Sequence, residues 1–334
     1  MATANSNPFD VRVVVPTPLA QAAAAMAPGS WATFSTNLDG AASLFDLIDA
    51  GGNPDKRITE YADKMVWLSG RQEIHFTGGG HNANEKTIMY TDADNTWHDL
   101  GTPPWYVQPV GGAIHGYQHN AGRGSTHYYL QFGGTTLHTR DIPSGTWGLL
   151  DTTGVSLGTA GALGALEWFP TFGTGSLIIV NGQTPAVYRW NGKSWSVVGS
   201  PAMGGYHNVG VYSPIKDLMY LGGGNGSNQL YTMSNVGSII PRASCPVEFG
   251  IIASVTTVDP VSGRLVLVCS DQVVRVYDPG TNTWFTDTAP PAGFFSAFYP
   301  EGNVMGVVAA PVYDYGVTMF ITIGGPAIYL RKGR

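Results

Sequence analysis

The hydrophobic pattern of this chain consists of short apolar runs that end in small residues. Between Met65 and Trp97, two apolar runs are separated by a turn, and the second run ends in three glycines, 78–80. A third run carries Tyr90 and leads through a polar turn to Trp97. Short apolar runs bounded by turn residues are typical of β-strands. The stretch therefore predicts a unit of about four short strands.

The same pattern recurs down the chain. Similar stretches cover residues 126–147, 175–195, 217–239, 263–284 and 316–329. Their second strands end at equivalent small-residue pairs: Gly78-Gly79, Gly133-Gly134, Asn181-Gly182, Gly222-Gly223, Cys269-Ser270 and Gly324-Gly325. Tyrosines stand seven residues before tryptophans in three units: Tyr90 and Trp97, Tyr188 and Trp195, Tyr277 and Trp284. This period, with about four strands per unit, predicts the blades of a β-propeller.

The order of apolar strand, diglycine, tyrosine and tryptophan resembles the kelch motif. The resemblance extends over roughly residues 58–334 and a short N-terminal piece. It implies a diverged kelch-repeat propeller of the galactose-oxidase-like superfamily, because one unit lacks the tryptophan and another lacks the diglycine. Kelch propellers serve as adaptors, as carbohydrate binders and, rarely, as enzymes.

The sixth unit runs out of chain before its fourth strand. The segment 28–31 mirrors the turn and tryptophan at 143–147, so it predicts the missing outer strand. Pairing there closes the ring and covers an open sheet edge. We expect an all-β, six-bladed kelch-like propeller closed by an N-terminal strand. The expected division is an N-terminal arm (1–27), a closing strand (28–36), a helical insert (37–57) and the blades (58–334).

Two segments outside the repeat have helical character. Residues 19–27 are rich in alanine, which favours a short helix in the arm. Residues 41–50 place apolar side chains at helical spacing, with Asp39 as the expected cap and a glycine pair as the stop. The arm either packs on the ring or docks on a neighbouring subunit.

The composition and net charge of the chain limit the kinds of partner that we expect it to bind. Hydrophobic residues make up 43% of the chain and charged residues only 12%, about half the usual ~25%. A net charge of −6 predicts no nucleic-acid partner. The C-terminal Arg331, Lys332 and Arg334 are expected to be solvated. The N-terminal segment has no secretion-signal pattern, no run is long enough to insert into a membrane, and the two cysteines predict no disulfide framework.

Ligands of a propeller are expected on the face formed by the connections between blades and by the loops after the diglycines. We call it the loop face. Aromatic, amide and other polar residues in these connections form the predicted binding set: His81, Asn82, Asn84, Glu85, Trp105, Tyr106, Trp168, His207, Asn225, Asn228, Phe294 and Phe295. Such side chains stack on sugars and bond their hydroxyls. The alternative is that Trp105 and Tyr106 fold back over the ring.

No metal, cofactor or catalytic set is predicted. His115 and His119 have a ligand-like spacing, but on an innermost strand four residues span about 13 Å, which is too far to share one ion. Glu167 is expected to line the channel without a partner carboxyl. The chain has no nucleophile-elbow or phosphate-loop motif.

The sequence therefore favours a non-enzymatic interaction or structural propeller. The leading hypothesis is a virion component, such as a phage tail or fibre-associated protein that binds a partner subunit or attaches to a host-surface glycan. An intracellular, cytoplasmic kelch adaptor is the first alternative. A carbohydrate-active enzyme working on the loop face is the second.

Overall fold

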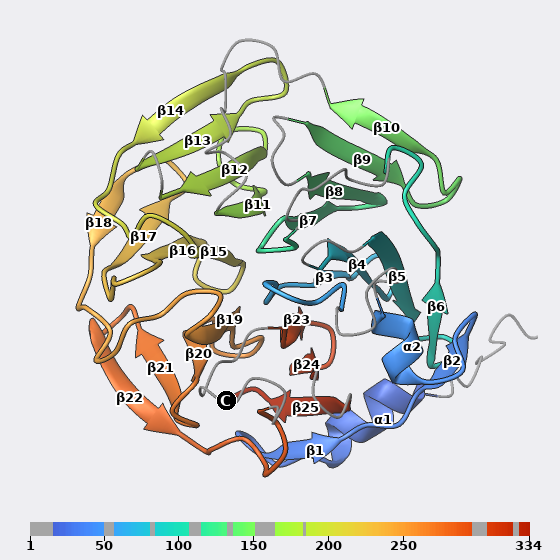
Figure 1. Cartoon of the computed structure of the whole chain (residues 1–334). Helices are drawn as coiled ribbons and strands as arrows, with labels where there is room; N and C mark the ends of the chain where they lie inside the picture. The colour runs from blue at the N-terminus through green and yellow to red at the C-terminus, as the bar shows by residue number, and fades with distance from the viewer. Residues whose placement is uncertain are drawn as a thin grey trace, which may run out of the picture.

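The computed structural model describes residues 16–49, 57–80, 84–106, 115–131, 136–150, 164–182, 185–295, 306–322 and 327–334. These residues form six sheets arranged radially about a central axis (Figure 1). Five sheets have four strands and one has five. The predicted all-β, six-bladed propeller is therefore confirmed.

Within each blade four strands pair antiparallel, from an innermost strand at the axis to an outer strand toward the rim. Blade 1 contains β3 (Val66–Leu68), β4 (Glu73–Gly79), β5 (Glu85–Thr91) and β6 (Thr96–Asp99). Blade 2 contains β7 (Asn120–Arg123), β8 (Thr126–Leu130), β9 (Leu137–Asp141) and β10 (Trp147–Leu150). Blade 3 contains β11 (Ala165–Phe169), β12 (Ser176–Asn181), β13 (Ala186–Trp190) and β14 (Trp195–Gly199).

The second half of the ring repeats this order. Blade 4 contains β15 (Asn208–Ser213), β16 (Leu218–Gly223), β17 (Leu230–Ser234) and β18 (Ile239–Pro241). Blade 5 contains β19 (Ser254–Val258), β20 (Leu265–Cys269), β21 (Val274–Asp278) and β22 (Thr283–Asp287). Blade 6 contains β23 (Val308–Val312), β24 (Val317–Ile321) and β25 (Ile328–Lys332), and its fourth strand is β1 (Trp31–Thr33).

The N-terminal strand closes the ring as the sequence predicts. β1 pairs antiparallel with β25, with Trp31 opposite Arg331. The Trp31 ring lies 5.2 Å from Phe294 and 5.3 Å from Phe320, so it fills space between blades 5 and 6. The ring of blades is therefore closed both by backbone pairing and by the partial burial of the large Trp31 side chain.

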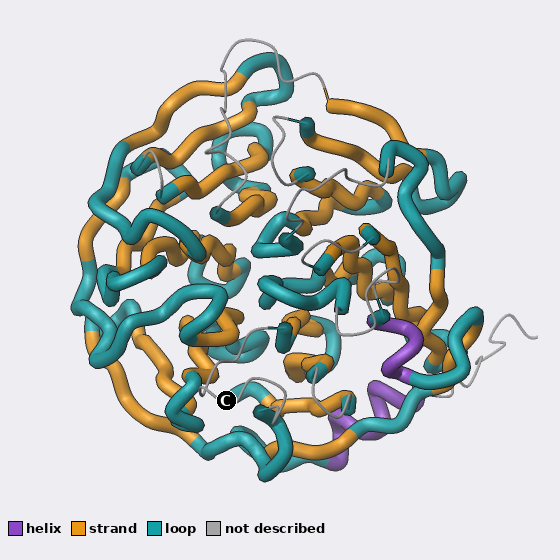
Figure 2. The backbone as a smooth tube through the Cα atoms, in the orientation of Figure 1, coloured by secondary structure: helices purple, strands orange, loops and turns teal. Residues whose placement is uncertain are grey.

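Both predicted helices are present, and they lie at one place on the rim (Figure 2). α1 (Pro18–Ala25) and α2 (Leu44–Ile48) bury Leu19 and Leu47 in the core cluster between blades 6 and 1. The cap of α2 is Ser43, so the expectation of Asp39 as its cap is wrong. Asp39 belongs instead to β2 (Asn37–Asp39), which pairs parallel with β6 as a fifth strand. No described helix is long and apolar enough to cross a membrane.

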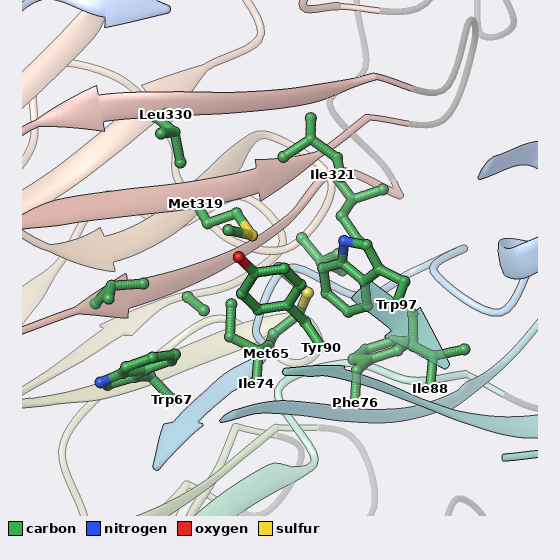
Figure 3. Close-up of a cluster of buried hydrophobic side chains, with 14 of the residues drawn as sticks. Met65, Trp67, Ile74, Phe76, Ile88, Tyr90, Trp97, Met319, Ile321 and Leu330 are labelled. Atoms are coloured by element: carbon green, nitrogen blue, oxygen red, sulfur yellow. The ribbon is translucent and has the colours of Figure 1, made fainter. Parts of the chain in front are cut away.

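Apolar side chains from facing blades interlock in the wedges between them (Figure 3). In blade 1, Tyr90 stands directly opposite Trp97, with 5.3 Å between ring centroids. Tyr277 and Trp284 repeat this pair in blade 5 at 5.2 Å. In blade 3 the same spacing gives another register, because Trp195 stands opposite Trp190 rather than Tyr188. The tyrosine and the tryptophan thus recur in all three blades, but they stand opposite each other only in blades 1 and 5.

Arg331 of the C-terminal tail is buried rather than solvated, which corrects the expectation from the sequence, whereas Arg334 is exposed. Arg331 is 1% exposed and forms ion pairs with Asp259, at 3.1 Å, and with Asp287. Lys332 Nζ donates to the carbonyl of Tyr315 at 2.9 Å. Arg331, on β25, therefore meets two acidic groups of blade 5.

Candidate functional site

The axis of the ring is closed by a buried polar cluster. Oδ2 of Asp63 accepts hydrogen bonds from Gln118 Nε2 at 2.9 Å and from the backbone N–H of Thr256 at 3.1 Å. Oε1 of Gln118 accepts from the N–H of Gly210 at 2.7 Å. Asp63 and Gln118 therefore connect blades 1, 2, 4 and 5 across the axis.

A second pair of side chains extends this cluster to blade 3. Lys64 Nζ donates to the carbonyl of Leu166 and lies 3.4 Å from Oε2 of Glu167. Glu167 also accepts from the N–H groups of Trp168, at 2.8 Å, and Tyr212, at 3.2 Å. We call Asp63, Lys64, Gln118 and Glu167 the polar plug.

The charges of the polar plug are shaped by burial. Burial raises the pKa of Asp63 to about 7, against the opposing effects of the Gln118 and Thr256 hydrogen bonds and of the Lys64 charge. Burial also lowers the pKa of Lys64, and Glu167 and Asp63 counteract that decrease. Near neutral pH Asp63 is thus partly protonated, and the Lys64 ammonium group lies beside the Glu167 side chain.

The polar plug separates two openings of the channel. On the loop face, Tyr61, His115, Tyr117 and His207 gather around the axis. Tyr61 stacks on His115 with 4.2 Å between ring centroids, and the His207 ring lies 5.9 Å from Tyr61. Nδ1 of His115 is 2.6 Å from the hydroxyl of Tyr117. The innermost strands of blades 1, 2 and 4 thus begin at an aromatic vestibule.

A pocket of about 150 Å³ adjoins this vestibule on the loop face. His207, Asn225 and Glu248 line it together with Phe249. Nδ1 of His207 donates to Oδ1 of Asn225 at 2.7 Å, because an amide oxygen can only accept. Burial lowers the pKa of His207, which favours the neutral imidazole. The structure therefore brings two predicted site residues together, beside the exposed Tyr206.

Another group of predicted residues forms a structural cluster between blades 1 and 2. Glu85 is buried and accepts from Trp105 Nε1 at 3.1 Å and from the Tyr129 hydroxyl at 3.2 Å. Trp105 stacks on His138 with 3.6 Å between ring centroids, so it folds back over the ring. Burial raises the pKa of Glu85 to about 7. Tyr106 likewise folds back, and its hydroxyl donates to Oδ1 of Asn84 at 3.2 Å.

The remaining predicted residues are spread over different parts of the fold. Phe294 is fully buried between blades 5 and 6, so the expectation of an exposed ring is wrong. Phe295 is half-buried against it at 5.1 Å. Trp168 sits near the end of β11, which places it at the opposite face of the ring. Asn228 donates to the carbonyl of Cys245 at 2.9 Å. His81 and Asn82 lie outside the described residues.

The second opening lies on the face formed by the turns between first and second strands, which we call the hairpin face. It contains a cavity of about 310 Å³ below the polar plug. Its lining includes the plug residues Lys64 and Glu167 and four aromatic side chains, namely Trp67, Trp168, Tyr212 and Tyr313. The sequence analysis missed this site. The sequence feature that could have indicated the site is a proline directly after an innermost strand, as Pro170 follows β11 and Pro214 follows β15.

Metal and thiol chemistry find little support in the part of the chain that the structure describes. Within that part, no three His, Cys, Asp or Glu side chains gather closely enough to hold an ion. Cys245 and Cys269 are free and buried. Burial raises their pKa values to about 11 and about 12, which disfavours the reactive thiolate.

No protein-family model matches this chain, and no curated protein matches it. Solved structures share its fold. A structural genomics protein of unknown function from Bacteroides thetaiotaomicron VPI-5482 is 14% identical, with a TM-score of 0.58 over 91% of this chain and 76% of that one. A chain of the mitotic checkpoint complex is 12% identical, with a TM-score of 0.55 over 100% of this chain and 97% of that one. At such identities the likeness shows the propeller fold alone.

Proposed function

We propose that the chain is a non-enzymatic interaction propeller of a virus particle. In this role it resembles a phage tail or fibre-associated protein that binds a partner subunit or a host-surface glycan. The propeller fold is consistent with an interaction or structural role, and a neighbour in fold belongs to a multi-protein complex. The particle, the partner and the virion location are our proposal.

The observation that supports the interaction role within this proposal is the apolar rim. The outermost strands of four consecutive blades each expose a large apolar side chain: Leu149 (70%), Val197 (58%), Ile240 (43%) and Phe285 (38%). These strands also present the free edges of their sheets. Exposed apolar side chains on unpaired edges favour contact with another chain. We define these four residues as the rim set.

The loop face supplies a second surface suited to binding. Tyr206 is 40% exposed beside the pocket that His207 and Asn225 line. A half-exposed ring next to an amide is suited to a glycan or to a polar protein surface. With charged residues at only 12% of the chain, long-range electrostatic attraction contributes little to such binding.

We also infer that the blades are diverged kelch repeats. The support is the recurrence of the opposed pairs Tyr90–Trp97 and Tyr277–Trp284 after strands that end in small residues. Removing the tryptophan from either pair should lower stability, and the loss should be larger in blade 1, where Trp97 is fully buried, than in blade 5, where Trp284 is half-buried. Unchanged stability in both variants would contradict a structural role for these pairs.

The proposed role is tested by locating the protein. Peptide mass spectrometry compares purified particles with the soluble cytosol of the source culture. We expect enrichment in the particles, and detection in cytosol alone would overturn the virion role in favour of a cytoplasmic adaptor. The double variant Leu149→Asp/Val197→Asp should then reduce incorporation. Val236→Asp, at a side chain 79% exposed outside the rim set, is the matched control.

The non-enzymatic part of the proposal has its own test. Host-envelope polysaccharide is incubated with the purified protein, and newly released reducing ends are measured. We expect no release above a buffer control. Release that disappears in Glu167→Gln would establish a carbohydrate-active enzyme instead.

A further inference from the structure

The cavity on the hairpin face has the construction of a small-ligand site. Its volume of about 310 Å³ lies at the lower end of the ~300–1,000 Å³ range of such pockets. All six innermost strands, or the residues that follow them, contribute to its lining. The site is therefore part of the rigid ring rather than of a single loop.

The aromatic walls of this cavity are held in fixed orientations. Trp67 Nε1 donates to Oδ2 of Asp314. The hydroxyl of Tyr212 donates to Oδ1 of Asp217 at 2.9 Å. Walls that are locked before a ligand arrives reduce the entropy lost on binding.

The deep end of the cavity is polar but has no net charge. Lys64 and Glu167 lie side by side there, with side chains 6% and 17% exposed. An ammonium group has three donors, and the described acceptors of Lys64 Nζ are the Leu166 carbonyl and Glu167. A ligand that brought an additional charge would lack a counter-charge, and burying it would cost free energy. The ligand that fits is therefore neutral.

A buried hydroxyl adds a further hydrogen-bonding position. Thr257 lines the cavity and is only 3% exposed, and its Oγ1 has no hydrogen-bond partner among the described residues. Buried polar atoms are normally satisfied, so such an atom in a cavity wall indicates a missing partner. Lys64, Glu167 and Thr257 together offer a donor, an acceptor and a group that can act as either.

We propose that this cavity binds a neutral, polyhydroxylated ring, such as a pyranose sugar. Each ligand hydroxyl both donates and accepts, which matches an adjacent ammonium and carboxylate without disturbing their pairing. The apolar face of the ring packs against the aromatic wall that includes Trp168 and Tyr212. This site is separate from the rim set and from the loop face, and its existence does not depend on the proposed function.

The test is calorimetric titration of the full-length protein with methyl glycosides of glucose, galactose, mannose and N-acetylglucosamine. At least one should bind, and Thr257→Val should weaken its affinity by about five- to tenfold, the loss expected for one hydrogen bond. Trp168→Ala should weaken it by at least tenfold. Methyl glucuronide, which carries a negative charge, should bind more weakly than methyl glucoside.

Thr286→Val, at an exposed position on the outermost strand β22, is the matched control and should leave the affinity unchanged. Asn225→Ala reports on binding at the loop-face pocket instead. Thermal melting of each variant establishes that it is folded, and Thr257→Val keeps the side-chain volume so that folding is preserved. Absence of binding by all four neutral glycosides would overturn the proposal. So would binding that Asn225→Ala abolishes while Thr257→Val and Trp168→Ala leave it intact.

Discussion

Arg331, three residues before the last residue of the sequence, forms an ion pair with Asp259 of the preceding blade at 3.1 Å, with side chains 1% and 2% exposed. Asp287 of the same blade accepts from the other Nη of this guanidinium. The pair lies next to β1, which Arg331 opposes in the closing sheet. Arg331 thus takes part both in the backbone pairing that closes the ring and in the ion pairs between blades 5 and 6.

Replacing Arg331 by Met should destabilise the ring strongly. Removing one partner of a buried ion pair leaves uncompensated buried carboxylates, which typically costs about 3–5 kcal/mol. Urea denaturation measures the free energy of unfolding. Arg334→Met is the control, because Arg334 is exposed and its pair with Asp287 should contribute less than about 1 kcal/mol. Equal losses in both variants would contradict the buried role of Arg331.

Trp31→Ala should weaken the closure of the ring. The ring of Trp31 contacts Phe294 and Phe320, and its Nε1 donates to the carbonyl of Thr288 at 3.1 Å. Loss of this half-buried plate is expected to cost about 3 kcal/mol. Thermal melting of Thr33→Ala, an exposed position on the same strand, provides the comparison. A melting temperature equal to that of Thr33→Ala would show that closure does not depend on Trp31.

Two adjacent phenylalanines should differ sharply in their effect on stability. Phe294 is fully buried among Trp31, Phe320 and Tyr329, so Phe294→Ala should cost about 3–5 kcal/mol. Phe295 is half-buried, and Phe295→Ala should cost about 1 kcal/mol. Chemical denaturation distinguishes the two. The reverse order would mean that Phe295, rather than Phe294, fills the wedge.

Asp63→Asn should change how stability depends on pH. The folded pKa of about 7 lies above the ordinary 3.8. Between about pH 4 and pH 7 the folded protein therefore keeps a proton that the unfolded chain has lost, so Asp63 contributes less stability as pH rises. Asparagine does not ionise. Relative to wild type, the variant should gain up to about 4 kcal/mol between pH 4 and pH 8.

Urea denaturation of both proteins at pH 4 and pH 8 measures this change. Glu85 and the other titrating groups are common to both proteins, so their contributions cancel in the difference. A stability difference that stays constant across this range would show that Asp63 is ionised in the folded protein throughout.

The sequence determined the elements and their repetition. Strand lengths, turn residues and aromatic spacing are local properties, so the six blades, the closing strand and both helices could be predicted from them. The seven-residue spacing of Tyr188 and Trp195 could not predict their register, because the turn lies at residues 191–194 and places Trp190 rather than Tyr188 opposite Trp195. β2 was also missed, since its partner β6 lies about sixty residues further along the chain.

Only the tertiary structure decided which side chains meet. Asp63 and Thr256 are 193 residues apart, and Arg331 and Asp259 are 72 apart, yet both pairs are in contact. No local pattern encodes such contacts, because they depend on the closure of the whole ring. The same closure buried Phe294 between blades 5 and 6. The sequence thus determined a ring of six blades, while the packing of those blades around the axis created the polar plug and the cavity beneath it.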